Sequence, residues 1–200
     1  MAVASYLIYV IVSGFVKSEE LDLYKSYLVS TNLSVSRVLT EVSTGTINHV
    51  PEIEESLEEP DRLSEIMRRI VTQNPHIHSC GISFVADSYP QKGHWYCPYA
   101  VRGENDKVEL RNIGDSHQDY LNAKWFTEAL KAEKDYWSKP FYGEGDSLRP
   151  QVSYMVPIHN KSGKTVAILG ADLLLDWFED NILKGMNYKG DSLKVYIHDH

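Results

Sequence analysis

The N-terminal part of the chain carries two hydrophobic patterns, one directly after the other. In the first, Ala2 to Val16, no side chain is charged. As a helix with ~1.5 Å per residue, this stretch spans roughly 23 Å, whereas the hydrocarbon core of a bilayer needs about 30 Å. Three interpretations are therefore open: part of a transmembrane helix, the core of a signal peptide, or a buried helix or strand of a soluble fold.

The second pattern is a heptad stripe, which predicts a long amphipathic helix. Its members alternate between spacings of three and four: Leu21, Tyr24, Leu28, Thr31, Val35, Val38 and Val42. Such a stripe fits pairing with a second copy of the chain, and it equally fits packing on the domain's own sheet. An apolar helix that continues into an amphipathic one is a common way to carry a signal across a bilayer, which favours the transmembrane interpretation of the first pattern. Gly45 is expected to end this helix.

A shorter helix is predicted after an acidic stretch. Glu52 to Pro60 is expected to be a solvated turn, and Pro60-Asp61 opens a helix that Asn74-Pro75 stops. Its apolar residues recur at helical spacing: Leu63, Ile66, Met67, Ile70 and Val71.

Beyond Pro75 the period changes to two, which predicts an antiparallel sheet of about five strands. The strands are expected at Ile82 to Asp87, at Trp95 to Val101, around Val108 and Leu110, at Val152 to Ile158 and at Val166 to Ala171. The last strand is almost continuously apolar, so we expect it at the centre. A helix is predicted from Ala123 to Lys134, an aromatic loop or edge strand from Asp135 to Asp146, and a closing helix from Leu173 to Leu183. The fold class is therefore α+β, with a long N-terminal helix packed on an antiparallel sheet.

Composition narrows the functional classes. The 200 residues include 20 basic and 28 acidic side chains, and the net charge of −8 argues against a nucleic-acid partner. Thirteen Tyr and four Trp suit both a core and a small-ligand pocket. Two histidine pairs, His76 with His78 and His198 with His200, lack a third ligand, so we expect exposed polar residues and neither a metal site nor a cofactor.

The two cysteines are predicted to be free thiols. A hairpin centred near Gln91 places Cys80 opposite Val101 and Cys97 opposite Phe84. That offset corresponds to about 13 Å at ~3.3 Å per residue, whereas a disulfide needs α-carbons within about 7 Å.

Several segments resemble the extracytoplasmic Cache sensor domains, which have a PAS-like fold. They are Asn74 to Ile77 before CGISFV, Asp119-Tyr120, Trp125-Phe126, Tyr136 to Phe141, Val152 to Ile158, Gly163-Lys164 and Ile168 to Trp177. The resemblance covers roughly residues 20 to 185 and implies an inserted helix over a PAS-like sheet. It also implies the membrane-distal module of a double-Cache receptor.

The resemblance sets the expected organisation of the chain. Residues 1–17 would be part of a transmembrane helix, 18–185 the distal Cache domain and 186–200 the start of a proximal module. It implies a receptor of the bacterial inner membrane with this domain in the periplasm. The output would be of the histidine kinase or serine phosphatase type. The expected partners are an unidentified small molecule, the membrane through the N-terminal helix, and a second copy through the same helix.

The resemblance also implies a ligand pocket between the sheet and the inserted helix. The candidate ligand-binding residues are Tyr120, Trp125, Phe126, Trp137, Tyr154 and Asp172. Asp172 matches the carboxylate that holds a ligand amine in amino-acid-binding members, although it could instead cap the closing helix. Trp125 could equally belong to the core. Those members carry an arginine where this chain has Ala123, which places an α-amino-acid ligand in doubt.

The sequence leaves three functional hypotheses. The leading one is a non-catalytic sensor module of a membrane receptor, with no catalytic residues. A soluble or secreted small-molecule binding protein of the same fold is the alternative. An enzyme is the least favoured, because the sequence offers no plausible nucleophile–base pair and no complete metal set.

Overall fold

Period-two alternation produces one antiparallel sheet in the computed structural model, which describes residues 2–143 and 149–176. The strand order is β3-β2-β1-β7-β6-β4, and β5 also pairs with β6. The strands are β1 (Ser79–Phe84), β2 (Pro98–Arg102), β3 (Val108–Asn112), β4 (Tyr136–Trp137), β5 (Phe141–Tyr142), β6 (Pro150–His159) and β7 (Thr165–Leu174). The α+β class and the central position of β7 are confirmed. The count exceeds five because the aromatic segment after α4 contributes two short strands.

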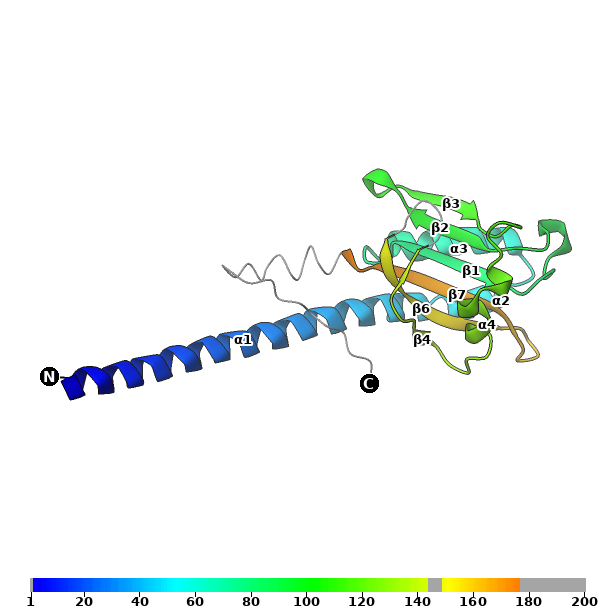
Figure 1. Ribbon diagram of the computed structural model, residues 1–200. Coiled ribbons are helices and arrows are strands. Elements are labelled where there is room, and N and C mark those ends of the chain that lie inside the picture. The colour runs from blue at the N-terminus through cyan, green and yellow to red at the C-terminus, as the bar shows by residue number, and fades with distance from the viewer. Residues whose placement is uncertain (1, 144–148, 177–200) are drawn as a thin grey trace. The chain divides into compact units, whose positions relative to one another are not determined.

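The helices are α1 (Ala2–Ile47), α2 (Val50–Glu55), α3 (Pro60–Gln73) and α4 (Lys124–Ala129), with 3₁₀ turns η1 (Pro90–Lys92), η2 (Glu104–Asp106) and η3 (Tyr120–Asn122). α3 and α4 lie on opposite faces of the sheet (Figure 1). α3 contacts β1, β2 and β3, whereas α4 contacts β6 and η3. We call the face under α3 the helix face and the other the pocket face.

The helix face carries the larger core. All five apolar residues predicted for α3 are at most 1% exposed, and they pack against strand residues such as Ile82 and Leu169. The segment expected to be a solvated turn is instead partly helical, because Pro51 occupies the first turn of α2 and Ile53 is fully buried in this core. Val50 and Leu57 pack against the same core on either side of Ile53.

α1 contributes to this core with residues near its C-terminal end. The chain divides into a unit of residues 37–176 and a second unit that includes residues 2–36. Within the first unit, Val38 and Val42 of the heptad stripe are buried, whereas Leu28 in the second unit is 61% exposed. Among the helical residues that the model describes, no stretch is long and apolar enough to cross a bilayer.

α1 does not end at Gly45. The helix continues to Ile47, and Gly45 has a packing role instead, since a Cβ there would lie 3.1 Å from Nδ2 of Asn74. The predicted helix from Ala123 to Lys134 is also shorter, because regular α-helix stops at Ala129.

The two cysteines are free and lie on opposite faces of the sheet. β1 and β2 pair one residue away from the predicted register, with Cys80 opposite Ala100. Cys80 therefore packs in the helix-face core, while Cys97 packs with Met155 and Ile168 on the pocket face. The prediction of two free thiols is confirmed, with an odd register offset as the reason.

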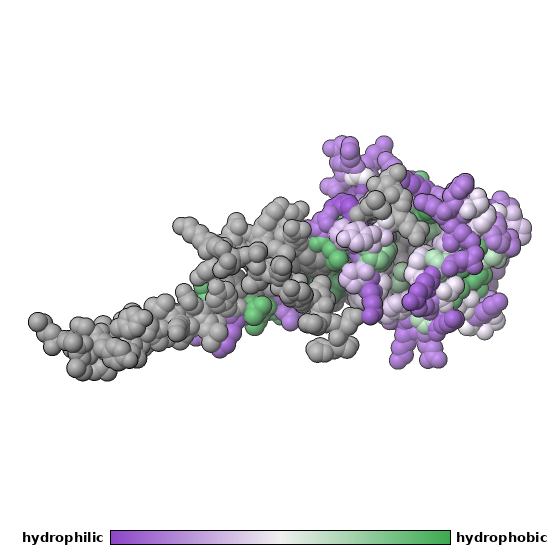
Figure 2. Space-filling model, viewed as in Figure 1, coloured by the Kyte–Doolittle hydropathy of each residue, from purple (hydrophilic) through white to green (hydrophobic). Residues whose placement is uncertain are grey.

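The surface of the strand-bearing unit is mainly hydrophilic on the side drawn in Figure 2, with hydrophobic residues visible only in small groups. This agrees with a sequence in which 24% of the residues are charged.

Candidate functional site

The pocket face of the sheet is hollowed where its central strands carry small side chains. Gly81 and Ser83 of β1, Gly170 of β7 and Ser153 of β6 all line a cavity of about 390 Å³. The residues that alternate with them on the same strands, such as Ile82, Phe84 and Leu169, face the other side of the sheet and fill the space under α3. The volume lies within the range of roughly 300–1,000 Å³ that is usual for small-ligand sites.

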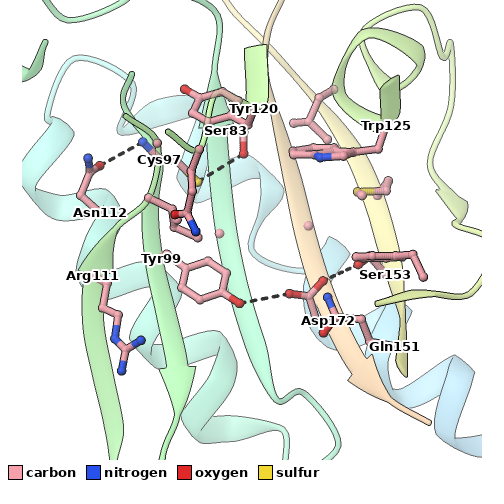
Figure 3. A pocket seen from close by; sticks show the side chains of 18 residues that line it. Ser83, Cys97, Tyr99, Arg111, Asn112, Tyr120, Trp125, Gln151, Ser153 and Asp172 are labelled. Carbon is pink, nitrogen blue, oxygen red and sulfur yellow. Dashed lines mark hydrogen bonds between the residues drawn. The ribbon is translucent and has the colours of Figure 1, made fainter. Parts of the chain in front are cut away.

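Asp172 lies at the floor of this cavity, in the middle of three strands (Figure 3). The register places Ser79 of β1 on one side of it and Ser153 of β6 on the other. The Ser79 hydroxyl donates to Oδ2 over 2.7 Å, the Ser153 hydroxyl donates to Oδ1, and the Tyr99 hydroxyl reaches Oδ2 at 3.4 Å. The carboxylate is thus held by neutral donors on both sides.

The electrostatic state of Asp172 follows from this setting. Burial raises the pKa of its carboxyl group above the ordinary value, and the hydrogen bonds from Ser153, Ser79 and Tyr99 offset part of that effect. Of the pocket-lining side chains, Arg111 is the one that carries a fixed positive charge, and it pairs with Glu109 at 3.0 Å. A cationic group in the cavity would supply the charge compensation that the hydroxyl groups do not.

Asp172 is not a helix cap. β7 continues to Leu174, so Asp172 is a strand residue whose side chain faces the cavity and whose backbone oxygen accepts from His78 N–H at 2.9 Å. The capping alternative is therefore wrong for the closing helix as predicted, because strand pairing with β1 and β6 extends past the expected strand end. Of that helix, residues 177–183 lie outside the described residues.

Tyr99 spans the cavity floor because the residue opposite it has no side chain. Gly81 pairs with Tyr99 across β1 and β2, and a Cβ on Gly81 would come within 2.7 Å of the Tyr99 ring. The ring lies toward β7, where its hydroxyl meets Asp172 (Figure 3). Burial and the nearby carboxylate raise the pKa of Tyr99, so its hydroxyl remains protonated and able to donate.

Two of the predicted aromatic residues form a wall of the cavity. Tyr120 of η3 and Trp125 of α4 both line it. The Tyr120 hydroxyl is held by the backbone, donating to the oxygens of Phe84 at 2.9 Å and Tyr96 at 3.1 Å. The Tyr120 ring packs directly on the backbone of Gly114, where a Cβ would lie 2.6 Å from the ring. The φ of +106° at Gly114 is also a conformation that favours glycine.

The other three predicted residues lie elsewhere. Phe126 is 1% exposed and packs edge-on against Trp125 at 5.5 Å, behind the cavity wall. Tyr154 belongs to the helix-face core, where its ring packs at a tilt against Trp137, with the ring centroids 5.3 Å apart, and its hydroxyl donates to Asp135. The prediction that Trp125, Tyr154 and Asp172 share one cavity thus holds for Trp125 and Asp172. It is wrong for Tyr154, because residues 153 and 154 point to opposite faces.

Several lining residues were missed from the sequence. They are Tyr99, Arg111, Gln118, Gln151 and Ser153, among others. Strand parity could have found Ser153 and Gln151, since they lie on the face of β6 opposite to the core residue Tyr154. Arg111 directly follows Leu110 in the predicted third strand and so lies on the opposite face from it, whereas Gln118 lies in the loop after β3, where the sequence offered no regular pattern.

The described residues contain no group of three or more His, Cys, Asp or Glu side chains placed to hold a metal ion. His76 instead lies 3.2 Å from Glu41 of α1, and His78 precedes β1. The second predicted pair, His198 and His200, is outside the described residues.

Comparison with known proteins places this geometry in a family. Residues 63–180, more than half of the chain, match the family model described as "Methyl-accepting chemotaxis protein-like, first PDC sensor domain". No curated protein matches the sequence.

Similar solved structures share the fold at low sequence identity. "Methyl-accepting Chemotaxis protein X" has a TM-score of 0.67 and 16% identity, covering 82% of this chain and 66% of that one. The extracellular domain of soHK1S-Z6, described as a histidine kinase, has a TM-score of 0.57 and 18% identity, with 80% and 66% coverage. The sensory domain of the Campylobacter jejuni chemoreceptor Tlp3 with isoleucine bound has 0.55 and 15%, with 80% and 61% coverage. The chain therefore spans less than two thirds of the length of these relatives.

Proposed function

Because the chain belongs to the family of first PDC sensor domains of methyl-accepting-chemotaxis-protein-like receptors, we propose that its cavity binds a small extracytoplasmic ligand with a cationic group. The resemblance to Cache sensor domains drawn from the sequence is confirmed by this membership. The observation that carries the ligand proposal is the buried Asp172 carboxylate at the floor of the 390 Å³ cavity, to which three hydroxyl groups of the described residues donate.

The proposed contacts follow from the lining. Asp172 pairs with the ligand cation, Trp125 and Tyr120 cover its apolar part, and Tyr99 donates from the floor. Phe126 supports Trp125 from behind. Ala123, just before α4, cannot supply the arginine that would hold a ligand carboxylate with two hydrogen bonds, so any anionic group of the ligand would meet Arg111 on β3.

The test is a thermal-unfolding screen of the chain with three probes at millimolar concentration: L-isoleucine, putrescine and succinate. A ligand at a hundredfold its dissociation constant stabilises by about 2.7 kcal/mol, which corresponds to a rise in Tm of roughly 5–10 °C. We expect an amine-bearing probe to raise Tm in the wild type and in Asp87→Asn. Asp87 is an exposed aspartate with φ 57°, which an asparagine adopts readily.

In Asp172→Asn the same probe should leave Tm unchanged, because the charge partner is gone. A shift from succinate alone, or an amine shift that persists in Asp172→Asn, contradicts the proposed role of Asp172.

The wider assignment is a membrane receptor. We propose that residues 1–17 anchor the chain in the inner membrane, that residues 18–185 form the distal sensor domain in the periplasm, and that 186–200 begin a proximal module. The sensor domain acts without catalysis, and the receptor output is of the kinase or phosphatase type. Support comes from the family, whose model is the first of the PDC sensor domains. Membrane fractionation of cells that express the chain tests the anchor, and recovery in the periplasmic supernatant contradicts it.

We also propose pairing of two chains through α1. The support is the heptad stripe, whose Leu28 is 61% exposed while Val38 and Val42 are used in the domain core. Cysteine at Leu28 should crosslink two copies in membranes, with cysteine at the exposed, off-stripe Ser30 as the matched control. Crosslinking at Ser30 and not at Leu28 contradicts the proposed pairing surface.

A further inference from the structure

One short segment connects the cavity floor with α1. It comprises residues 74–79, the stretch between the end of α3 and the start of β1. At its far end, Ser79 donates to the Asp172 carboxylate at 2.7 Å, and His78 N–H donates to the Asp172 backbone oxygen at 2.9 Å. Any movement of Asp172 therefore acts directly on this end of the segment.

The near end is fastened to α1. The Asn74 side chain donates from Nδ2 to the backbone oxygen of Glu41 at 2.9 Å, and the carboxylate of Glu41 lies 3.2 Å from His76 Nε2. In a helix, the Glu41 carbonyl also accepts from the amide of Gly45. Asn74 can approach this turn closely because Gly45 has no side chain. A Cβ at Gly45 would lie only 3.1 Å from Asn74 Nδ2.

The segment between these ends is stiff. Pro75 fixes its own φ and holds Asn74 in the extended conformation that ends α3. His76 N–H donates to Asn74 Oδ1 at 2.9 Å and Ile77 N–H donates to the Asn74 oxygen at 3.2 Å. Arg102 of β2 braces both ends, since its guanidinium donates to the Asn74 oxygen at 3.1 Å and its backbone N–H donates to the His78 oxygen at 2.8 Å.

We infer that residues 74–79 couple occupancy of the cavity to the Glu41–Gly45 turn of α1, with Asn74 as the positioning residue. The inference rests on the proposed function, in which a ligand cation draws on Asp172. That pull shifts Ser79 and His78 along β7, and the stiff segment passes the shift to Asn74 and so to α1. Coupling of this kind is reciprocal, so the position of α1 also sets the affinity of the cavity.

The experiment needs no identified ligand. Asp172→Asn reproduces a carboxylate whose charge has been neutralised, and amide hydrogen exchange of residues 42–46 in the full chain reports on the α1 turn. Coupling free energies between sites usually correspond to at least about fivefold, so we expect a change of about that size in the exchange rates on Asp172→Asn. In an Asn74→Ala background, the same substitution should change the rates by less than about twofold, since coupled positions are non-additive.

Gly45→Ala provides a second test if Asn74→Ala folds poorly. Its methyl group presses on Asn74 Nδ2 while favouring the helix, so the relay should weaken in a stable protein. Gln73→Ala, an exposed neighbour on the last turn of α3, is the matched control and should leave the effect of Asp172→Asn intact.

An unchanged α1 on Asp172→Asn, or an equal change with and without Asn74, overturns the inference. Those outcomes leave the thermal-shift screen unaffected, so loss of the relay and loss of ligand binding are distinguished.

Discussion

The two faces of the sheet are formed by the same strands, but one face carries a filled core and the other a cavity. On β1, Cys80, Ile82 and Phe84 fill the helix face, while Gly81 and Ser83 leave the pocket face hollow. On β7, Ala167, Leu169 and Ala171 alternate in the same way with Ile168, Gly170 and Asp172. The domain thus concentrates apolar burial on one side and keeps a polar, underfilled cavity on the other.

This division separates stability from binding within single strands. Neighbouring residues lie on opposite faces, so a substitution at one position should change the free energy of unfolding and the next should change the cavity. The contrast can be tested residue by residue along β1 and β7.

The largest effect is expected on the helix face, at Ile82. Its side chain is fully buried under α3 and pairs across the sheet with Leu169. Ile82→Ala should lower the free energy of unfolding by about 2–5 kcal/mol through lost burial and a cavity. Urea denaturation measures this, and Ser83→Ala is the control on the other face. Ser83 contacts Cys97 Sγ at 3.2 Å, so its loss should cost only about 0.5–1.5 kcal/mol. Equal costs at the two positions would contradict the division.

A smaller effect is expected at Gly81, where the cavity floor begins. A Cβ would lie 2.7 Å from the Tyr99 ring, so Gly81→Ala must displace that ring into the cavity. We expect a loss of about 1–3 kcal/mol from overpacking, together with loss of ligand binding. Gly163→Ala serves as a comparison in a turn, since its φ of +78° is strained for alanine while no atom lies within 4 Å of the added methyl. Retained binding in Gly81→Ala and an unchanged Tyr99 environment by NMR would sink the prediction.

Asp172 should show a trade-off between stability and function that depends on pH. Burial raises the pKa of its carboxyl group in the folded state. Its contribution to stability is therefore fully present below the unfolded-state pKa and is lost as pH rises through the folded-state pKa. Asp172→Asn carries no charge at any pH, so at neutral pH the variant should be more stable than the ligand-free wild type. Urea titrations between pH 4 and pH 8 should show this advantage shrinking as the pH falls. A stability difference that does not vary with pH would mean that Asp172 keeps an ordinary pKa.

Much of the helix face could be predicted from the sequence, because burial there follows simple periods. The apolar residues of α3 and the central position of β7 follow directly from the spacing of Leu63 to Val71 and of Val166 to Ala171. The cavity was harder, since it depends on register. β1 and β2 pair one residue away from the expected alignment, and a bulge between Ile158 and His159 shifts β6 against β7. Tyr154 was assigned to the cavity by the resemblance to Cache domains, whereas the alternation along β6 places Ser153 in the cavity and Tyr154 in the helix-face core.

The smallest effect is expected from chemical labelling of the two cysteines, one on each face of the sheet. This experiment leaves the fold intact. Cys80 lies in the helix-face core and Cys97 lines the cavity, although both are buried. Burial raises the pKa of Cys97 to about 12, and that of Cys80 is raised as well. At pH 8 the thiolate of Cys97 is thus scarcer than that of a free cysteine, with its usual pKa of about 8.5, by a factor on the order of 10³.

Native labelling by a small methanethiosulfonate reagent should therefore be slow at both thiols and faster at Cys97, which the reagent can reach through the cavity. Mass spectrometry after timed quenching measures the two rates, with Cys80→Ala and Cys97→Ala assigning each signal. In Gly81→Ala the Cys97 rate should fall, because the displaced Tyr99 ring blocks the approach to the sulfur, while the Cys80 rate should change only with overall stability. Faster labelling of Cys80 than of Cys97 would show that reagent access comes from opening of the α3 side, and that the pocket face is the more tightly closed of the two.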